Sequence, residues 1–136
     1  MVELWRYACT IEDPELFYHS TLPLNFSGTF IRENTAILEQ ARERYTTLDY
    51  PPLVRLIDAF LKLDITDQLH QIKVPTCVIA GENYILKPAY PYSKVIHDKV
   101  PNSEMIVVPD AGHALIFDKP EEFNSIVLGF LQKHGN

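Results

Sequence analysis

The sequence predicts an α/β fold in which a helical segment is followed by a two-stranded parallel sheet with a βαβα order of elements. Residues 1–63 carry apolar side chains at helical spacing and show no strand pattern, whereas residues 64–136 alternate short apolar runs with helical periods. A strand, a helix, a strand and a helix in that order favour a right-handed parallel crossover between the two strands. We therefore divide the chain into a helical segment, 1–63, and a βαβα segment, 64–136.

The helical segment contains three helix signals. The tripeptide Asp-Pro-Glu that begins at Asp13 predicts a helix start, because a carboxylate can cap the first turn, proline fits that turn, and an acid there lies at the positive end of the helix dipole. Apolar residues within 37–45 recur at helical spacing and predict a second helix. The proline pair at 51–52 opens a third helix, whose apolar residues fall on one face.

The βαβα segment contains signals for two strands and two helices. Val74–Ala80 is an apolar run that is followed by Gly81, which is typical of a buried parallel strand. Residues 92–100 predict a short helix, and Glu104–Val108 predicts the second strand. The last helix is expected over 120–134, because proline and two glutamates occupy its first turn, basic residues occupy its last turn, and glycine follows it.

Composition and charge exclude several classes of function. The formal net charge is −6, which gives nucleic-acid binding no electrostatic support. No apolar run approaches the ~20 residues of a membrane-spanning helix, and the amino terminus lacks the pattern of a signal peptide. Cys9 and Cys77 are too few for a disulfide framework, and no cysteine or histidine spacing suggests zinc. We therefore expect a cytoplasmic protein without metal, cofactor, nucleic acid or membrane as a partner.

A histidine in a turn is the most informative motif of the chain. The pentapeptide Pro-Asp-Ala-Gly-His, which ends at His113, follows the second predicted strand, and Pro-Glu-Glu-Phe at 120–123 opens the last helix. A histidine in such a turn lies at the carboxyl end of a strand, where a general base can reach a substrate. This order of strand, histidine turn and helix resembles the end of the core of the α/β-hydrolase family.

The resemblance extends over most of the chain. The loop 81–88 begins Gly-Glu-Asn-Tyr and ends Lys-Pro, and it resembles the family's loop after the penultimate strand, which is usually Gly-x-x-Asp with a proline a few residues on. The helical segment 1–63 resembles the cap, or lid, that many members insert before that strand. The chain therefore resembles the C-terminal portion of an α/β-hydrolase, made of the cap, the last two strands and the histidine loop.

The resemblance implies hydrolysis of an ester, amide or related carbonyl compound by a serine nucleophile, with His113 as the general base and no cofactor. Two departures limit what this chain can do. The motif Gly-x-Ser-x-Gly occurs nowhere in it, so the nucleophile is absent and is expected before Met1, together with the oxyanion-hole loop. The position of the triad acid holds Tyr84, a phenol that is neutral near pH 7. Neighbouring Glu82 could replace the acid only if the loop were rebuilt.

The remaining polar side chains are given structural roles. Asp110 and Asp118 are expected to serve turn and helix-entry geometry. Tyr84 is interpreted either as a packing residue or as a residue with a binding or residual triad role. No nucleophile elbow surrounds any serine, so we expect caps and solvated turns for Ser20, Ser27, Ser93, Ser103 and Ser125. The other histidines, His19, His70, His97 and His134, show no partner spacing, and we expect them to be ordinary solvated residues.

Three interpretations of function follow from these patterns. The chain is a truncated, carboxylesterase-like hydrolase that keeps His113 and is inactive alone, its full-length parent acting on a small carbonyl substrate. The alternatives are a non-catalytic module that binds a ligand or partner through the cap, and a truncation product whose folding depends on self-association. Two parallel strands seldom form a stable sheet alone. We therefore expect a homodimer in which the edge strand Val74–Ala80 pairs with its copy in antiparallel fashion about a two-fold axis.

Overall fold

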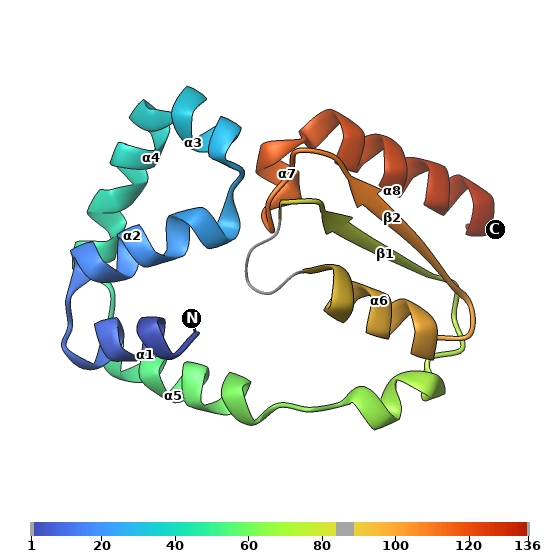
Figure 1. Cartoon of the computed structure of the whole chain (residues 1–136), viewed down its shortest axis with the longest axis horizontal. Coiled ribbons are helices and arrows are strands. Elements are labelled where there is room, and N and C mark those ends of the chain that lie inside the picture. Colours follow the sequence, from blue (N-terminus) through green and yellow to red (C-terminus); the bar gives the residue numbers. More distant parts are fainter. Residues whose placement is uncertain (1, 84–88, 136) are drawn as a thin grey trace.

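The computed structural model describes residues 2–83 and 89–135, which form a group of helices beside a small sheet with its own helices (Figure 1). The helical group comprises α1 Val2–Thr10, α2 Pro14–Asn25, α3 Gly28–Glu33, α4 Thr35–Arg42, the 3₁₀ turn η1 Glu43–Thr47 and α5 Tyr50–Lys62. The sheet group comprises the 3₁₀ turn η2 Thr66–Gln71, β1 Thr76–Gly81, α6 Ala89–Lys99, β2 Ser103–Val108, α7 Leu115–Asp118 and α8 Pro120–His134.

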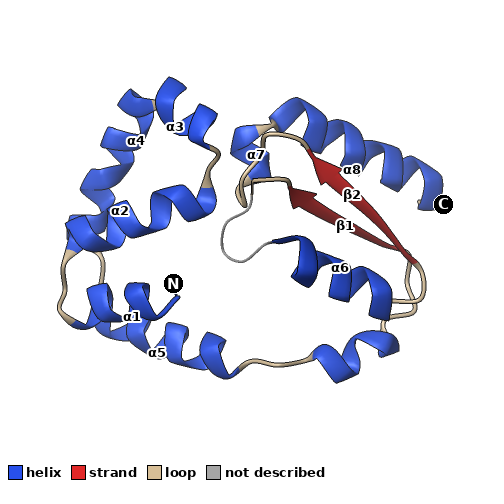
Figure 2. Cartoon of the chain, in the orientation of Figure 1, coloured by secondary structure: helices blue, strands red, loops and turns tan. Residues whose placement is uncertain are grey.

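The two strands of the sheet are parallel. Thr76 lies opposite Ser103 at one end of the ladder, and Gly81 lies opposite Val108 at the other. Helix α6 connects the strands and packs against both of them, and α6 and α8 lie on opposite sides of the strands (Figure 2). The α/β fold expected from the sequence, a helical segment followed by a two-stranded βαβα unit, is therefore confirmed.

Strand β1 begins later than the sequence predicts. The expected strand Val74–Ala80 starts two residues too early, because Pro75 has no N–H to donate to a ladder and Val74 is 66% exposed. The backbone pairing instead begins where the Thr76 N–H donates to the Asn102 carbonyl, at 2.9 Å. The strand also runs one residue further than expected, to position 81.

The helix signals of the first 63 residues correspond to observed helices. Asp13 caps α2, because its Oδ1 accepts a hydrogen bond from the Leu16 N–H at 2.9 Å, and Pro14 occupies the first turn. The periodic run within 37–45 forms most of α4 and then tightens into η1. The proline pair at 51–52 lies in the first turn of α5. Helices α1 and α3 were not predicted from the sequence. Ser27 caps α3, and α1 is held by contacts with α5 and α2.

Each group of elements has a hydrophobic core of its own. In the helical group, partly buried neighbours such as Trp5 and Phe17 surround a buried cluster of Cys9, Tyr50 and Ile57. In the sheet group, Ile79, Phe123 and Ile126 pack against a buried cluster of Val108, Ala111 and Leu115. Ala111 belongs to the turn that carries His113, so this turn is packed into the core of the sheet group.

The Asp13 cap generates a first prediction. Asp13→Ala removes the side-chain acceptor for an N–H at the start of α2 and should lower the free energy of unfolding by about 1 kcal/mol. Asp13→Ser, which keeps a capping oxygen, should lose much less. Urea unfolding followed by circular dichroism, at one fixed protein concentration, measures both variants. Equal losses of unfolding free energy in the alanine and serine variants would contradict a capping role for Asp13.

Candidate functional site

The histidine turn, residues 109–114, connects β2 to α7 at the carboxyl end of the sheet. Asp110 has a positive φ of 48°, a left-handed conformation that aspartate adopts more readily than most residues. Its N–H donates to Glu82 Oε2 at 3.2 Å, and its carboxylate accepts a hydrogen bond from Asn83 Nδ2 at 3.1 Å. The expected turn role of Asp110 is thus confirmed, and Glu82 and Asn83 tie the turn to the loop that leaves β1.

Gly81 allows the end of β1 to approach the histidine turn closely. A Cβ atom at this position would lie 2.2 Å from the Gly112 carbonyl oxygen and 2.3 Å from the Ala111 carbonyl oxygen. Both distances are far below van der Waals contact, and both neighbours are backbone atoms that cannot turn away. The Asn83 N–H then donates to the Ala111 carbonyl at 2.9 Å. The two loops that the sequence singled out, after β1 and after β2, are therefore packed directly on each other.

The Asp118 carboxylate joins the histidine turn to the helical group. It accepts hydrogen bonds from the Gly112 N–H and from the N–H of Ser27, the latter at 3.0 Å. The Ser27 hydroxyl also lies 3.4 Å from Asp118 Oδ1. Next to this set, the Ala114 N–H donates to the Asn25 carbonyl at 2.7 Å. We call these contacts the Asp118 clamp. Asp118 was expected to serve helix-entry geometry, and its carboxylate also reaches across the chain to the α2–α3 junction.

Gly112 is the point at which the chain of the helical group touches the turn. A Cβ atom at Gly112 would lie 2.7 Å from the Phe26 carbonyl carbon and 2.8 Å from the Asn25 carbonyl oxygen. A side chain there would push the α2–α3 junction away and break the clamp. Both neighbours of His113 in the chain, Gly112 and Ala114, are therefore held by backbone contacts to the same junction.

His113 itself is exposed at the end of the sheet. Partial desolvation lowers the pKa of its imidazole below the ordinary histidine value, because the charged form loses hydration that the neutral form does not need. A neutral imidazole is the form that can accept a proton. The exposed position of His113 and the lowered pKa of its imidazole both suit a general base. The contacts of the turn fix the backbone from which this side chain extends.

The position expected for a triad acid, Tyr84, lies outside the described residues. Glu82, the neighbour considered as a substitute, directs its Oε2 to the N–H of Asp110. This carboxylate therefore supports the backbone of the turn. Within the described residues, the loop that leaves β1 thus supplies structural support for the histidine turn.

Most of the serines and histidines that the sequence gave no catalytic role have polar partners within the chain. Ser27 caps α3 by accepting a hydrogen bond from the Phe30 N–H, as expected, but it is only 3% exposed and not solvated. Three of the other histidines, which were expected to be ordinary solvated residues, have polar partners. His19 Nε2 lies 3.6 Å from Glu15 Oε2. His97 Nδ1 lies 2.8 Å from the Ser103 hydroxyl, and His134 Nε2 lies 2.8 Å from a Glu104 carboxylate oxygen. The pairs of His97 and His134 join a helix to β2, which sequence spacing alone does not reveal.

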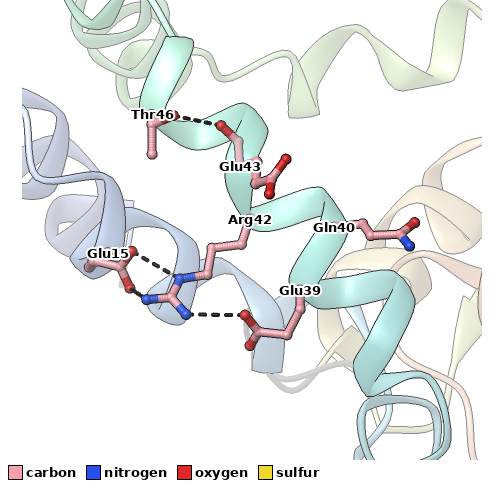
Figure 3. A pocket seen from close by; sticks show the side chains of 6 residues that line it. All are labelled: Glu15, Glu39, Gln40, Arg42, Glu43 and Thr46. Carbon is pink, nitrogen blue, oxygen red and sulfur yellow. Dashed lines mark hydrogen bonds and ion pairs between the residues drawn. The ribbon is translucent and has the colours of Figure 1, made fainter.

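A hollow of about 380 Å³ lies on the helical group, lined by α2, α4 and η1 (Figure 3). Arg42 crosses it, with Nε 2.9 Å from Glu15 Oε1 and Nη1 3.1 Å from Glu39 Oε2. These hydrogen bonds, that with Glu15 foremost, raise the pKa of Arg42 above its already high ordinary value. The carboxylates are thus paired with a guanidinium that ties α2 to α4, and we interpret the hollow as structural.

Across residues 2–83 and 89–135, no group of three or more histidine, cysteine, aspartate or glutamate side chains is arranged to hold a metal ion. No helix in the same part of the chain is both long enough and apolar enough to cross a bilayer.

Comparison with known proteins gives the family. No protein-family model matches the chain. It is 33% identical over 120 residues to a proline iminopeptidase of Thermoplasma volcanium, covering 87% of this chain and 39% of the relative. It is 28% identical over 120 residues to a putative carbamate hydrolase RutD of Azorhizobium caulinodans, covering 86% and 44%. An α/β-hydrolase enzyme from a Medee basin deep-sea metagenome library superposes with a TM-score of 0.85 at 26% identity, covering 96% of this chain and 49% of that one. The chain belongs to the α/β-hydrolase family.

The chain spans about half the length, or less, of the proteins it matches. Its elements correspond to the C-terminal portion of an α/β-hydrolase, as the histidine turn and the last helix indicated. The Asp118 clamp is the feature of this hydrolase portion that sequence reasoning missed. Ser27 and Asp118 are 91 residues apart, and no motif or periodicity in one sequence connects positions at that distance.

The clamp generates a second prediction. Asp118→Ala removes the acceptor for two backbone N–H groups and should lower the free energy of unfolding by about 2 kcal/mol. Amide hydrogen exchange of Gly112 and Ser27 should accelerate in the same variant, because those two N–H groups lose their acceptor. Asp118→Asn keeps one oxygen acceptor and is the matched control, with a smaller effect on both measurements. Wild-type exchange rates at Gly112 and Ser27 in the alanine variant would contradict the clamp.

The pKa of His113 generates a third prediction. Nuclear magnetic resonance titration of its ring protons should give a midpoint below the ordinary value of about 6.5. The folded state then binds this proton less readily than the unfolded state, so the stability contributed is complete above pH of about 6.5 and falls as the pH drops through that value. His113→Gln should flatten this part of the stability profile. A wild-type midpoint at or above the ordinary value would contradict the desolvation of the ring.

Proposed function

We propose that this chain is the histidine-bearing portion of a serine hydrolase that acts on an ester, amide or related carbonyl compound. The observation that carries the proposal is His113, held at the carboxyl end of β2 by its two chain neighbours: the Gly112 N–H donates to the Asp118 carboxylate, and the Ala114 N–H donates to the Asn25 carbonyl. The lowered pKa of its imidazole supports the role of base. The names of the two relatives, a peptidase and a carbamate hydrolase, support a carbonyl substrate.

The proposed chemistry assigns His113 two proton transfers. As a serine hydroxyl attacks the carbonyl carbon of the substrate, the imidazole takes the hydroxyl proton and becomes an imidazolium. When the tetrahedral intermediate collapses, the imidazolium gives that proton to the leaving group, and an acyl-serine ester remains. Water then attacks the ester by the same two transfers and releases the acid. The serine must come from a segment with a nucleophile elbow, since Gly-x-Ser-x-Gly does not occur in this sequence.

The proposal therefore includes inactivity of the chain alone. A serine hydrolase needs a nucleophile, a base and oxyanion donors together. Of these three parts, His113 is the one that this sequence offers by resemblance. A cytoplasmic location is part of the same proposal and is supported by Cys9 and Cys77, which are both free thiols in the structure.

A non-catalytic module is the second candidate. It is favoured by Tyr84 in the position of the triad acid, because a neutral phenol does not stabilise an imidazolium as a carboxylate does. It is also favoured by the separate core of the helical group, which holds α1, α2 and α5 together without help from the sheet. Under this alternative, the helical surface would bind a ligand or a partner and His113 would have no chemical role.

Hydrolysis of a short-chain aryl ester tests the proposal and its alternative. The purified chain should show no turnover above that of its own His113→Ala variant, because nucleophile and oxyanion hole are missing. Saturable hydrolysis that disappears in the variant would contradict the proposed inactivity of the chain alone.

The same ester-hydrolysis assay tests His113 as the base when an N-terminal half is supplied as a separate chain. The N-terminal half of a related α/β-hydrolase, added to this chain, should give weak activity that His113→Ala abolishes. Tyr84→Asp should raise that activity by at least about tenfold, since loss of the acid costs triads up to ~10⁴-fold in rate. The complementary half mixed with His113→Ala is the matched control. A complex that forms but gives no His113-dependent activity would favour the non-catalytic module.

A further inference from the structure

The α2–α3 junction lies beside α7, the short helix that follows His113 (Figure 1). Two hydrogen bonds join these segments. The Ala114 N–H donates to the Asn25 carbonyl at 2.7 Å, and the Ser27 N–H donates to Asp118 Oδ2 at 3.0 Å. Ser27 is 3% exposed, so removal of the carboxylate would leave a buried N–H without its acceptor, which is costly. The helical group therefore holds the chain that follows the proposed base.

An aromatic contact joins the same segments between these two hydrogen bonds. The ring of Phe26 lies edge-on to the ring of Phe117, with ring centroids 6.3 Å apart, and is stacked on the ring of Phe30 at 4.8 Å. Both separations lie in the range of attractive ring pairs, about 4.5–7 Å. The backbone of Phe26 also lies against Gly112, where a Cβ atom would be 2.7 Å from the Phe26 carbonyl carbon. Three successive residues of the junction thus contact the chain on either side of His113.

The sheet group supports the histidine turn from the other side. The Asn83 N–H donates to the Ala111 carbonyl at 2.9 Å, and Ala111 and Leu115 both lie in the buried core of the sheet group. His113 comes between Ala111 and Leu115 in the chain, where the contacts of the sheet group and those of the α2–α3 junction meet. The direction of its backbone therefore depends on both groups of elements.

We propose that Asp118 and Phe26 are positioning residues for the base, through which the helical group sets the direction in which the His113 side chain leaves the backbone. This role rests on the proposed function, in which His113 transfers protons. A base must lie within about 2.6–3.2 Å of its proton partner, and a misplacement of about 1 Å can cost about 100-fold in rate. Leu115 keeps α7 in the sheet core, so a displaced junction tilts the turn without unfolding it. A change in the position of the helical group is therefore transmitted to His113.

Nuclear magnetic resonance relaxation of the His113 amide tests the positioning in the purified chain, without an assay of hydrolysis. The amide order parameter should lie near the rigid value of about 0.85 in the wild type and should fall toward the flexible range, below about 0.6, in Asp118→Ala. Asp118→Asn keeps an oxygen acceptor for the N–H groups of Gly112 and Ser27 and should restore most of the rigid value. A folded Asp118→Ala variant with the wild-type order parameter would overturn the positioning role.

A matched pair of phenylalanine substitutions tests the aromatic contact. Phe26→Leu removes the ring at the junction, whereas Phe17→Leu makes the same change in α2, beside the separate core of the helical group. Phe26→Leu should lower the His113 order parameter and accelerate hydrogen exchange of the Ala114 amide by up to about tenfold, the factor that corresponds to one aromatic pair. Phe17→Leu should change neither, and circular dichroism shows whether each variant is folded. Equal effects of the two substitutions, or no effect of Phe26→Leu in a folded variant, would overturn the assigned contact path.

The ester-hydrolysis assay with a separate N-terminal half distinguishes this inference from the proposed function. Asp118→Ala should lower kcat by about 10–100-fold and change KM by less than about twofold, because the base is displaced while substrate binding is not. Asp118→Asn should recover most of the lost kcat. A wild-type kcat in Asp118→Ala, in a complex whose activity depends on His113, would overturn the positioning role alone. Complexes without any His113-dependent activity would contradict the proposed function instead, and the order parameters would still show whether the junction fixes the turn.

Discussion

The carboxylate of Asp118 holds together two parts of the molecule that the chain separates by 91 residues. Two backbone N–H groups, those of Gly112 and Ser27, donate to the same carboxylate oxygen, Oδ2. Backbone N–H groups cannot be left unpaired at a packed junction without a free-energy cost of about 1–3 kcal/mol each. The carboxylate removes that cost for both segments, and the arrangement of the helical group beside the sheet depends on it.

The clamp also holds the backbone on either side of His113. The Gly112 N–H donates to Asp118, the Ala114 N–H donates to the Asn25 carbonyl, and the turn packs on Gly81. A base on a mobile loop would lose rate, because proton transfer requires a fixed distance to the nucleophile. In this chain the described residues support the turn that carries His113, the proposed base, while the motif Gly-x-Ser-x-Gly does not occur in the sequence. The contacts that hold the histidine turn are therefore present in this chain, although the nucleophile motif that a serine hydrolase needs is not.

The sheet is ordered by contacts within the described residues. Two strands and their helices form a parallel ladder with a packed core on the side of α8. Parallel sheets are usually covered by helices on both faces, and α6 and α8 lie on opposite sides of the strands here (Figure 2). Within the described residues, β2 is the strand that pairs with β1.

The sequence by itself determined the order of elements and the place of the histidine turn. Local signals suffice for these, because the Asp13 cap, the proline pair in the first turn of α5, and the proline and glutamates that open α8 act within a few residues of their position. It could not determine that β1 starts after Pro75, that Glu82 binds the turn, or that His97 and His134 pair with residues of β2. Those contacts, and above all the Asp118 clamp, exist only when distant segments are brought together. A single sequence carries periodicity and caps, but the distance between Ser27 and Asp118 is decided by how the helical group packs against the sheet.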